Sequence, residues 1–215
     1  MKLDQHFLTN EAIARGIVSF LNVKDKESVL EIGPGKGILS QYIKRATLVE
    51  IDSDLAEELK NNFPNHKIIN NSILKIKLNY DKIIGNIPYS ICEPLINKLI
   101  KSNFKLCILT VPERFLEKRL LYLIIPNILE IRTLMKIDKK EFSLVPRVNS
   151  KVIEIKKKVL NNKERFIKKI YIQSDKKLKN VINTNLRFRE KRVRELNINE
   201  WKVLLNDIKR ARING

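Results

Sequence analysis

The sequence predicts an α/β fold: a doubly wound, mostly parallel sheet of seven strands, followed by a small helical part rich in basic residues. Three observations support this. Short apolar runs, typical of buried strands, alternate with segments of helical periodicity up to residue 157. A glycine-rich turn follows the first run, where such sheets often bind a ligand. After residue 158 no strand pattern remains.

The strands are expected at residues 28–32, 46–51, 66–70, 82–85, 106–111, 128–137 and 151–157. Helical spacing predicts a first helix through Leu21, capped by Thr9 or Asn10. Further helices are expected over 37–45, 53–61 (opened by Ser53), 93–101 and 112–121, the last with Pro112 at its first position. Short basic helices are expected over 163–172, 176–185 and 199–208. We therefore predict two domains, residues 1–158 and 159–215.

Composition limits the class of protein. The chain has 215 residues, 43% of them hydrophobic, which is enough for a substantial core. It has no apolar run of about 18 residues and no secretory leader pattern, so we expect no membrane association and a cytoplasmic location. Cys92 and Cys107 are the two cysteines, without CxxC spacing, so neither a disulfide framework nor a metal site is expected.

The charge is strongly positive and unevenly placed. The chain has 43 Lys and Arg against 24 Asp and Glu, a formal net charge of +19. Of these, 20 basic and 7 acidic residues lie in the last part, Lys151 to Gly215. Such an excess favours a polyanionic partner through phosphate contacts and counterion release. A basic surface produced by residue usage alone is the alternative.

The glycine turn indicates a cofactor. Gly33, Gly35 and Gly37 follow Glu31, a spacing that differs from the dinucleotide fingerprint and from a P-loop. Glu50 ends the next strand, about 20 residues on, where a carboxylate can accept both ribose hydroxyls. A ligand with a ribose, an adenine and a charged amino acid tail but no pyrophosphate is S-adenosylmethionine. A tight turn without a ligand is the alternative.

A second motif, Asn86-Ile87-Pro88-Tyr89, follows the fourth strand. The Asn86 amide oxygen and the Ile87 carbonyl can accept hydrogen bonds from an exocyclic amino group, which positions that amine for methyl transfer. Tyr89 can stack on the planar base that carries the amine. The motif therefore predicts a site for a planar amine beside the cofactor. An Asn-Pro turn with a core tyrosine is the structural alternative.

These motifs are arranged as in a known family. From about Asp4 to Lys157 the chain resembles the rRNA adenine N6-dimethyltransferases, meaning the KsgA-like ribosomal enzymes and the Erm resistance methylases. The matching segments are Gln5-His6-Phe7-Leu8, Glu31 to Gly37, Val49 to Asp52, Asn86 to Tyr89, and Phe142 to Ser150. The resemblance implies a class I methyltransferase fold, Rossmann-like, with S-adenosylmethionine as cofactor and no metal.

The resemblance also assigns residues. Phe142 is the expected partner of Tyr89 at the target base, which makes Asn86, Ile87, Pro88, Tyr89 and Phe142 the candidate catalytic set. Asn71 stands where the family has an aspartate that contacts the cofactor adenine. Leu144 and Asn149 replace a usual proline and aspartate. The expected cofactor-binding residues are Gln5, His6, Phe7, Leu8, Glu31, Gly33, Gly35, Gly37, Glu50, Ile51, Asn71, Ser72 and Asn86.

RNA contacts are expected from basic residues late in the chain. The run from Arg187 to Arg194 contains an aromatic residue within an arginine cluster, which suits single-stranded or distorted RNA. A solvated basic helix is the alternative. The candidates are Arg147, Lys176, Lys177, Lys179, Arg187, Arg189, Arg192 and Arg194.

The sequence therefore predicts an enzyme that dimethylates adenine N6 in ribosomal RNA. Pro146, Val148 and Ser150 favour the small-subunit type, which modifies two adjacent adenosines near the RNA 3′ end, with ribosomal RNA or an assembling small subunit as partner and the chain as a monomer. Alternatives are a large-subunit resistance methylase, a non-catalytic RNA-binding assembly factor, and a methyltransferase for DNA adenine or protein glutamine.

Overall fold

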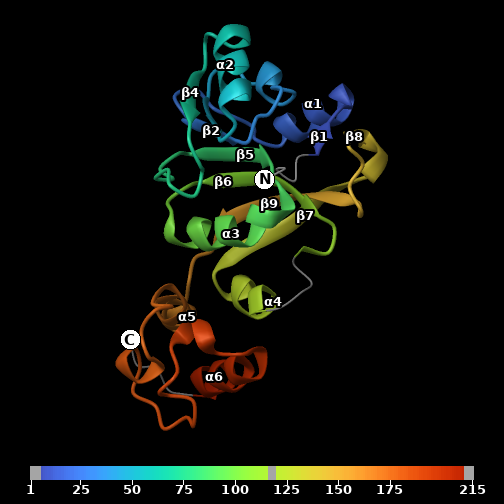
Figure 1. The fold of residues 1–215 in the computed structure, drawn as a ribbon. Helices are drawn as coiled ribbons and strands as arrows, with labels where there is room; N and C mark the ends of the chain where they lie inside the picture. The colour runs from blue at the N-terminus through green and yellow to red at the C-terminus, as the bar shows by residue number, and fades with distance from the viewer. Residues whose placement is uncertain (1–5, 116–119, 211–215) are drawn as a thin grey trace. The chain divides into compact units, whose positions relative to one another are not determined.

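The computed structural model describes residues 6–115 and 120–210, which form two compact units (Figure 1). The first unit contains Met1–Phe115 and Ile131–Lys157, and the second contains Leu116–Glu130 and Lys158–Gly215. Within the described residues, no helix has the length and apolar character needed to cross a membrane.

The first unit is built on a seven-stranded sheet with the strand order β4-β3-β2-β5-β6-β9-β7. Strands β4, β3, β2, β5 and β6 run parallel, and β9 runs antiparallel to β6. This confirms the predicted α/β class and all seven strands. Their bounds are β2 Val29–Ile32, β3 Thr47–Glu50, β4 Lys67–Asn70, β5 Lys82–Asn86, β6 Leu106–Pro112, β7 Leu129–Ile137 and β9 Ser150–Lys157.

The helices of this unit are α1 (Glu11–Ser19), α2 (Ser53–Asn62) and α3 (Cys92–Lys101). Asn10 caps α1, since its side chain accepts a hydrogen bond from Ile13 N at 3.1 Å, as one of the two predicted caps. Helix α2 begins at Ser53, as predicted, and Asp52 caps it, because the Asp52 carboxylate accepts from the amides of residues 54 and 55.

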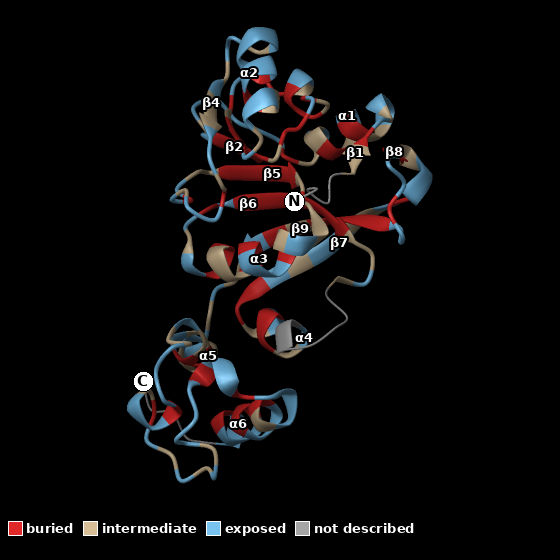
Figure 2. Cartoon of the chain, viewed as in Figure 1, coloured by how far each residue is buried: buried red, intermediate tan, exposed pale blue. Residues whose placement is uncertain are grey.

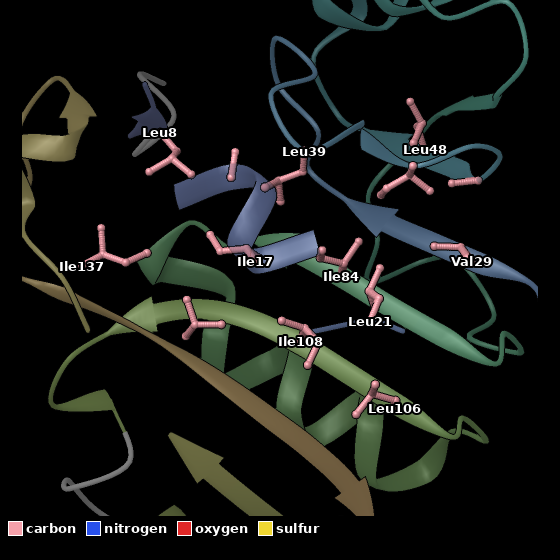
Figure 3. Close-up of a cluster of buried hydrophobic side chains, with 14 of the residues drawn as sticks. Leu8, Ile17, Leu21, Val29, Leu39, Leu48, Ile84, Leu106, Ile108 and Ile137 are labelled. Atoms are coloured by element: carbon pink, nitrogen blue, oxygen red, sulfur yellow. The ribbon is translucent and has the colours of Figure 1, made fainter. Parts of the chain in front are cut away.

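A continuous apolar core lies against the sheet (Figure 3). Ile17 and Leu21, from α1 and the turn after it, pack with Ile84 of β5 and Ile108 of β6, and all four side chains are fully buried. Figure 3 shows α1 on one face of the strands while α3 passes behind them. Central strands covered on both faces read as continuous apolar runs, which is why the sequence located them correctly.

A second, two-stranded sheet joins the two ends of the first unit. Strand β1 (Phe7–Leu8) pairs antiparallel with β8 (Phe142–Ser143), Phe7 opposite Ser143 and Leu8 opposite Phe142. Thr9 N extends the pairing by donating to the Glu141 carbonyl at 2.9 Å. The N-terminal segment is therefore fixed beside a segment more than 130 residues away.

Three predicted helices are corrected. Residues 37–45 form turns and the short 3₁₀ helix η1 (Ser40–Tyr42), because Gly37 has φ +83° and Ile43 is already extended. Pro112 ends β6 instead of beginning a helix; residues 116–119 of that predicted helix lie outside the described part, and α4 begins at Leu120. Residues 176–185 contain one 3₁₀ turn, η6 (Leu178–Asn180), because their backbone is engaged by another segment.

The second unit contains α4 (Leu120–Ile124), α5 (Asn162–Ile172) and α6 (Ile198–Arg210), which confirms the helices predicted at 163–172 and 199–208. Asn161 and Glu164 form a capping box at the start of α5. Trp201 of α6 is fully buried, with its ring centroid 6.2 Å from that of Tyr171. Short 3₁₀ turns also occur in both units: η2 (Tyr89–Ile91) and η5 (Lys139–Glu141) in the first, and η4 (Ile125–Asn127) and η7 (Val193–Glu195) in the second.

Gly37 provides a test of the packing. A Cβ there would lie 2.3 Å from Phe63 Cε2, and φ is +83°, so we expect Gly37→Ala to lower the free energy of unfolding by about 2–4 kcal/mol. The matched control is Gly16→Ala in α1, where a Cβ meets nothing within 4 Å and helix propensity predicts a gain of about 1 kcal/mol. Urea denaturation followed by circular dichroism measures the stability of both variants. Equal unfolding midpoints for Gly37→Ala and wild type would contradict the close packing of Phe63 against Gly37.

Candidate active site

One cavity lies where the parallel strands end. Its walls come from the residues that follow β2, β3, β4 and β5, together with the N-terminal segment and β8. Ligands bind at this carboxyl edge in doubly wound sheets because the loops there leave a crevice. The lining residues are His6, Phe7, Ile32, Gly33, Gly35, Val49, Glu50, Ile51, Asn71, Ser72, Ile73, Asn86, Ile87, Pro88, Tyr89, Ser90, Ile91 and Phe142.

The glycine loop fits closely against the N-terminal segment. Gly33 and Gly35 have φ of +60° and +56°, a region that favours glycine. A Cβ on Gly35 would lie 2.7 Å from the Phe7 ring, so the absence of a side chain lets that ring cover the loop. Gly37 lines neither this cavity nor its neighbour; it makes room for Phe63 instead.

Glu50 fixes the glycine loop and the turn after β3 through hydrogen bonds to their backbone amides. Its Oε2 accepts a hydrogen bond from Gly35 N at 3.1 Å, and its Oε1 accepts from Ile51 N at 2.8 Å and from Asp52 N at 3.0 Å. A carboxylate has about four acceptor positions, so roughly one remains for a ligand hydroxyl. Ile51, which lines the cavity beside it, is 55% exposed, an apolar surface suited to a flat base.

Glu31 lines a neighbouring cavity, with Phe7, Leu8, Gly33, Lys36 and Asn86 among its other walls. Its carboxylate is 1% exposed and accepts a 2.7 Å hydrogen bond from Ser40 Oγ. Burial raises the pKa of Glu31 to about 8; the Ser40 hydrogen bond opposes this, and the nearby Glu50 carboxylate adds to it. A cationic ligand in this cavity would favour the ionised form.

Asn86 is held in one orientation. Its Nδ2 donates a 2.9 Å hydrogen bond to the His6 carbonyl, which leaves Oδ1 on the opposite edge of the amide. The next residue is also fixed, since Ile87 N donates to the Thr110 carbonyl at 3.1 Å and the Ile87 side chain is buried. Two hydrogen-bond acceptors, Asn86 Oδ1 and the Ile87 carbonyl, are thus presented by a rigid strand end.

Two aromatic residues complete the cavity. The Tyr89 hydroxyl lies 3.0 Å from Ser150 Oγ and 3.4 Å from the Val148 carbonyl, and its ring centroid is 5.6 Å from that of His6. Phe142 is 3% exposed and belongs to the core cluster while lining the cavity. Tyr89 is therefore positioned by β9, and Phe142 by its pairing with β1.

The structure brings most of the predicted site residues together. Of the cofactor set, Leu8 and Glu31 line the neighbouring cavity only, Gly37 lines neither, and Gln5 lies outside the described residues. Sequence reasoning missed Ile32, Val49, Ile73, Ser90 and Ile91, which also line the cavity at the strand ends. Ile32 and Val49 are direct sequence neighbours of Glu31 and Glu50. Ser90 and Ile91 directly follow the Asn86 motif, whereas Ile73 has no local signal beyond its place after Ser72.

The predicted RNA contacts come from two segments of the second unit that pair through their backbones, except Arg147, which is exposed in the loop after β8. Leu178 N donates to Lys191 O, and Val193 N to Lys176 O, at 2.9 and 3.0 Å. The basic side chains make ion pairs at the surface: Glu190 contacts Lys177, Lys179 and Arg189, Asp175 contacts Arg194, and Glu195 contacts Arg192. Exposed pairs of this kind contribute about 0–1 kcal/mol, so phosphates can replace the acids.

A family model described as ribosomal RNA adenine dimethylase matches residues 1–213. The chain belongs to this family. The resemblance predicted from the sequence motifs is confirmed, and so are the enzyme class and the cofactor, S-adenosylmethionine.

Among its relatives is a protein of Malacoplasma penetrans named ribosomal RNA small subunit methyltransferase A. The two are 34% identical over 73% of this chain, and the match spans 65% of the relative, which is under two thirds of its length. Another, from Lysinibacillus sphaericus, is named rRNA adenine N-6-methyltransferase and is 33% identical over 74% of this chain and 71% of its own. The crystal structure of a dimethyladenosine transferase from Plasmodium falciparum shares the fold, with a TM-score of 0.68 at 21% identity, over 95% of this chain and 98% of that one.

The cavity residues of this family member suit the cofactor. Gly33 and Gly35 bring bare backbone to the cavity wall, and Glu50 keeps acceptor capacity beside them. Glu31 and Glu50 would place carboxyl groups at the walls of the cavities that receive this cofactor, which carries a sulfonium and an ammonium group. Asn71 Oδ1 accepts from Ser72 N at 2.8 Å and retains a second acceptor position for an adenine amino group.

Glu31 makes stability depend on pH. In the folded chain its pKa is about 8, against 4.5 as the ordinary value, so its stabilising contribution is complete below about 4.5 and is lost as the pH rises through about 8. We expect the melting temperature of the cofactor-free protein to fall between pH 5 and pH 8, and to fall less in Glu31→Gln. Differential scanning calorimetry measures this. The exposed Glu57→Gln should keep the wild-type slope, and parallel curves for Glu31→Gln and wild type would refute the assignment.

Proposed function

We propose that this chain dimethylates N6 of two adjacent adenosines near the 3′ end of small-subunit ribosomal RNA, as a cytoplasmic monomer acting on an assembling small subunit. The observation that carries the proposal is the Asn86 amide, which the His6 carbonyl fixes at the wall of the cavity that contains the glycine loop. An oriented acceptor beside a cofactor cavity is what methylation of an exocyclic amine requires.

Adenine N6 is a weak nucleophile because its lone pair is delocalised into the ring. S-adenosylmethionine supplies a strongly electrophilic methyl group, so the protein has to orient the amine rather than provide a strong base. Asn86 Oδ1 and the Ile87 carbonyl would accept the two N6 hydrogens, which favours a tetrahedral nitrogen and points its lone pair at the methyl group. Pro88 keeps the backbone between these groups and Tyr89 rigid.

Tyr89 would hold the adenine by stacking, worth about 1–3 kcal/mol. Its hydroxyl contacts with Ser150 and Val148 restrict the ring to one position, while Phe142 forms an apolar wall of the same cavity. The adenine has to leave its stack to enter, because N6 is inaccessible in a paired or stacked base.

The two parts of the chain divide the work in this proposal. Residues 1–158 hold the cofactor and the target base. Residues 159–215 dock on RNA phosphates through the basic side chains of the paired segments, namely Lys176, Lys177, Lys179, Arg187, Arg189, Arg192 and Arg194, and Arg147 adds a contact from the loop after β8.

The choice of small-subunit RNA is supported by the late segment. Ser150 and Val148, two of the residues that favour this type in the sequence, are the residues that contact the Tyr89 hydroxyl. The name of the Malacoplasma penetrans relative agrees. Modification of large-subunit RNA is the second candidate; the name of the Lysinibacillus sphaericus relative, rRNA adenine N-6-methyltransferase, specifies neither subunit.

Asn86→Ala tests the chemistry. With labelled S-adenosylmethionine and undermethylated small and large subunits, we expect wild type to form dimethyladenosine in small-subunit RNA. The variant should be at least 100-fold slower, through loss of a positioned acceptor of the kind worth about 2.7–4 kcal/mol in other enzymes. For the exposed control Asn65→Ala, both the methylation rate and the cofactor affinity, measured by calorimetry, should stay within twofold of wild type.

The outcomes separate the candidate functions. Dimethyladenosine only in large-subunit RNA would assign the chain to the resistance type. No methylation of either RNA, with the cofactor still bound, would favour a non-catalytic assembly factor and refute the proposed enzyme.

Lys176→Gln with Arg187→Gln tests RNA docking. Each phosphate contact contributes about 0.7–0.9 to the slope of log affinity against log salt, so loss of two contacts should weaken binding of small-subunit RNA and reduce the slope by about 1.4–1.8. Filter binding at several salt concentrations measures this. The exposed lysines of α2 and α3, Lys60 and Lys101, provide the control pair; an equal effect in both pairs would indicate non-specific charge alone.

A further inference from the structure

The loop that joins β8 to β9 exposes aliphatic side chains at an unusual place. Leu144, Val145 and Val148 are 72%, 57% and 46% exposed, whereas Phe142, Pro146 and Ser150 in the same stretch are buried (Figure 2). The three buried residues anchor the loop at its start, middle and end. The apolar side chains between them are therefore held outward rather than left in a loose segment.

Leu144 is also in a costly backbone conformation. Its φ is +55°, in the left-handed region that non-glycine residues rarely adopt. The His6 ring contributes to holding it there, because His6 Nδ1 donates a hydrogen bond to the Leu144 carbonyl. Asn149 fixes the other end, since its Oδ1 accepts from Lys139 N and its carbonyl accepts from Glu113 N. Strain that the surroundings maintain often marks a functional segment.

The loop is continuous with the cavity. His6, which holds Leu144, lines the cavity and also supplies the carbonyl that orients Asn86. The Val148 carbonyl and Ser150 contact the Tyr89 hydroxyl on the other side. The loop that carries the exposed aliphatic residues thus contacts both His6, which orients Asn86, and Tyr89, the residue proposed to stack on the base. Arg147 and Lys140, exposed in or beside the same loop, suit a phosphate backbone.

We propose that Leu144 and Val145 form an apolar wedge that inserts into the RNA stack where the target adenine leaves it. Proteins that distort nucleic acids commonly insert leucine or similar side chains between bases, which offsets the cost of unstacking them. The wedge rests on the proposed function and extends it: Tyr89 and Asn86 hold the adenine, and Leu144 with Val145 occupy the gap it leaves, so the loop is a positioning element for the RNA.

The test compares two RNAs with the variant Leu144→Asn, Val145→Ser, in the full chain. Asparagine tolerates the left-handed conformation, so the loop keeps its backbone. One RNA is the undermethylated small subunit. The other is a short oligonucleotide whose target adenosine is flanked by abasic nucleotides and has no stack to leave. We expect kcat/KM to fall at least tenfold on the subunit and less than twofold on the oligonucleotide. Val159→Ser, a change at a 92% exposed valine, is the matched control.

A second readout does not depend on turnover. With 2-aminopurine in place of the target adenosine in an RNA fragment from the 3′ end of the small subunit, binding of wild type should raise the fluorescence as the base unstacks. The variant should give less than half of that increase at saturation.

Equal losses of kcat/KM on the two RNAs would show a structural role and overturn the wedge, as would unchanged rates or unchanged 2-aminopurine fluorescence. If wild type methylates neither RNA, the proposed function itself fails and the wedge with it. Methylation of the oligonucleotide by wild type and variant alike, with loss only on the subunit, supports both.

Discussion

The short pairing of β1 with β8 is the contact on which the site depends. It places three consecutive residues, His6, Phe7 and Leu8, where each supports a different part: the His6 carbonyl orients Asn86, the Phe7 ring covers Gly35, and Leu8 is buried in the core. A two-stranded pairing of this length is weak alone. Burial of Leu8 and Phe142, at 4% and 3% exposure, stabilises it, so packing of the core and geometry of the site are coupled.

Two buried carboxyl groups give the two cavities a preference for a cationic ligand. Two carboxyl groups, Glu31 and Glu50, are nearly excluded from solvent at adjoining strand ends. The Glu50 oxygens are compensated by three backbone amides, whereas Glu31 has the single hydroxyl of Ser40. The unequal compensation explains why burial raises the pKa of Glu31 to about 8. A cationic cofactor would relieve that penalty, since an opposite charge favours the ionised carboxylate.

Most of the sheet and the catalytic motif were accessible from the sequence because both are local signals. Buried strands are short apolar runs, and Asn86 to Tyr89 carry their chemistry in four adjacent residues. The errors arose where distant residues decide the conformation. Phe63 fills the space beside Gly37 at the start of the predicted helix over 37–45, and residues 189–193 engage the backbone of 176–179. Neither partner can be recognised from the segment itself, and the wall residue Ile73 was missed for the same reason.

The connectivity of the sheets has a consequence for synthesis of the chain. Strand β1 is translated early, but its partner β8 follows about 135 residues later, and β7 lies next to β9, a strand made after it. At roughly 5–20 residues per second, the ribosome needs on the order of 7–27 seconds to supply β8. During that interval Phe7 and Leu8 have no strand to pair with. The complete wall of the cavity, which includes Phe7 and Phe142, therefore forms late in the synthesis of the chain, once nearly all of the first unit has been made.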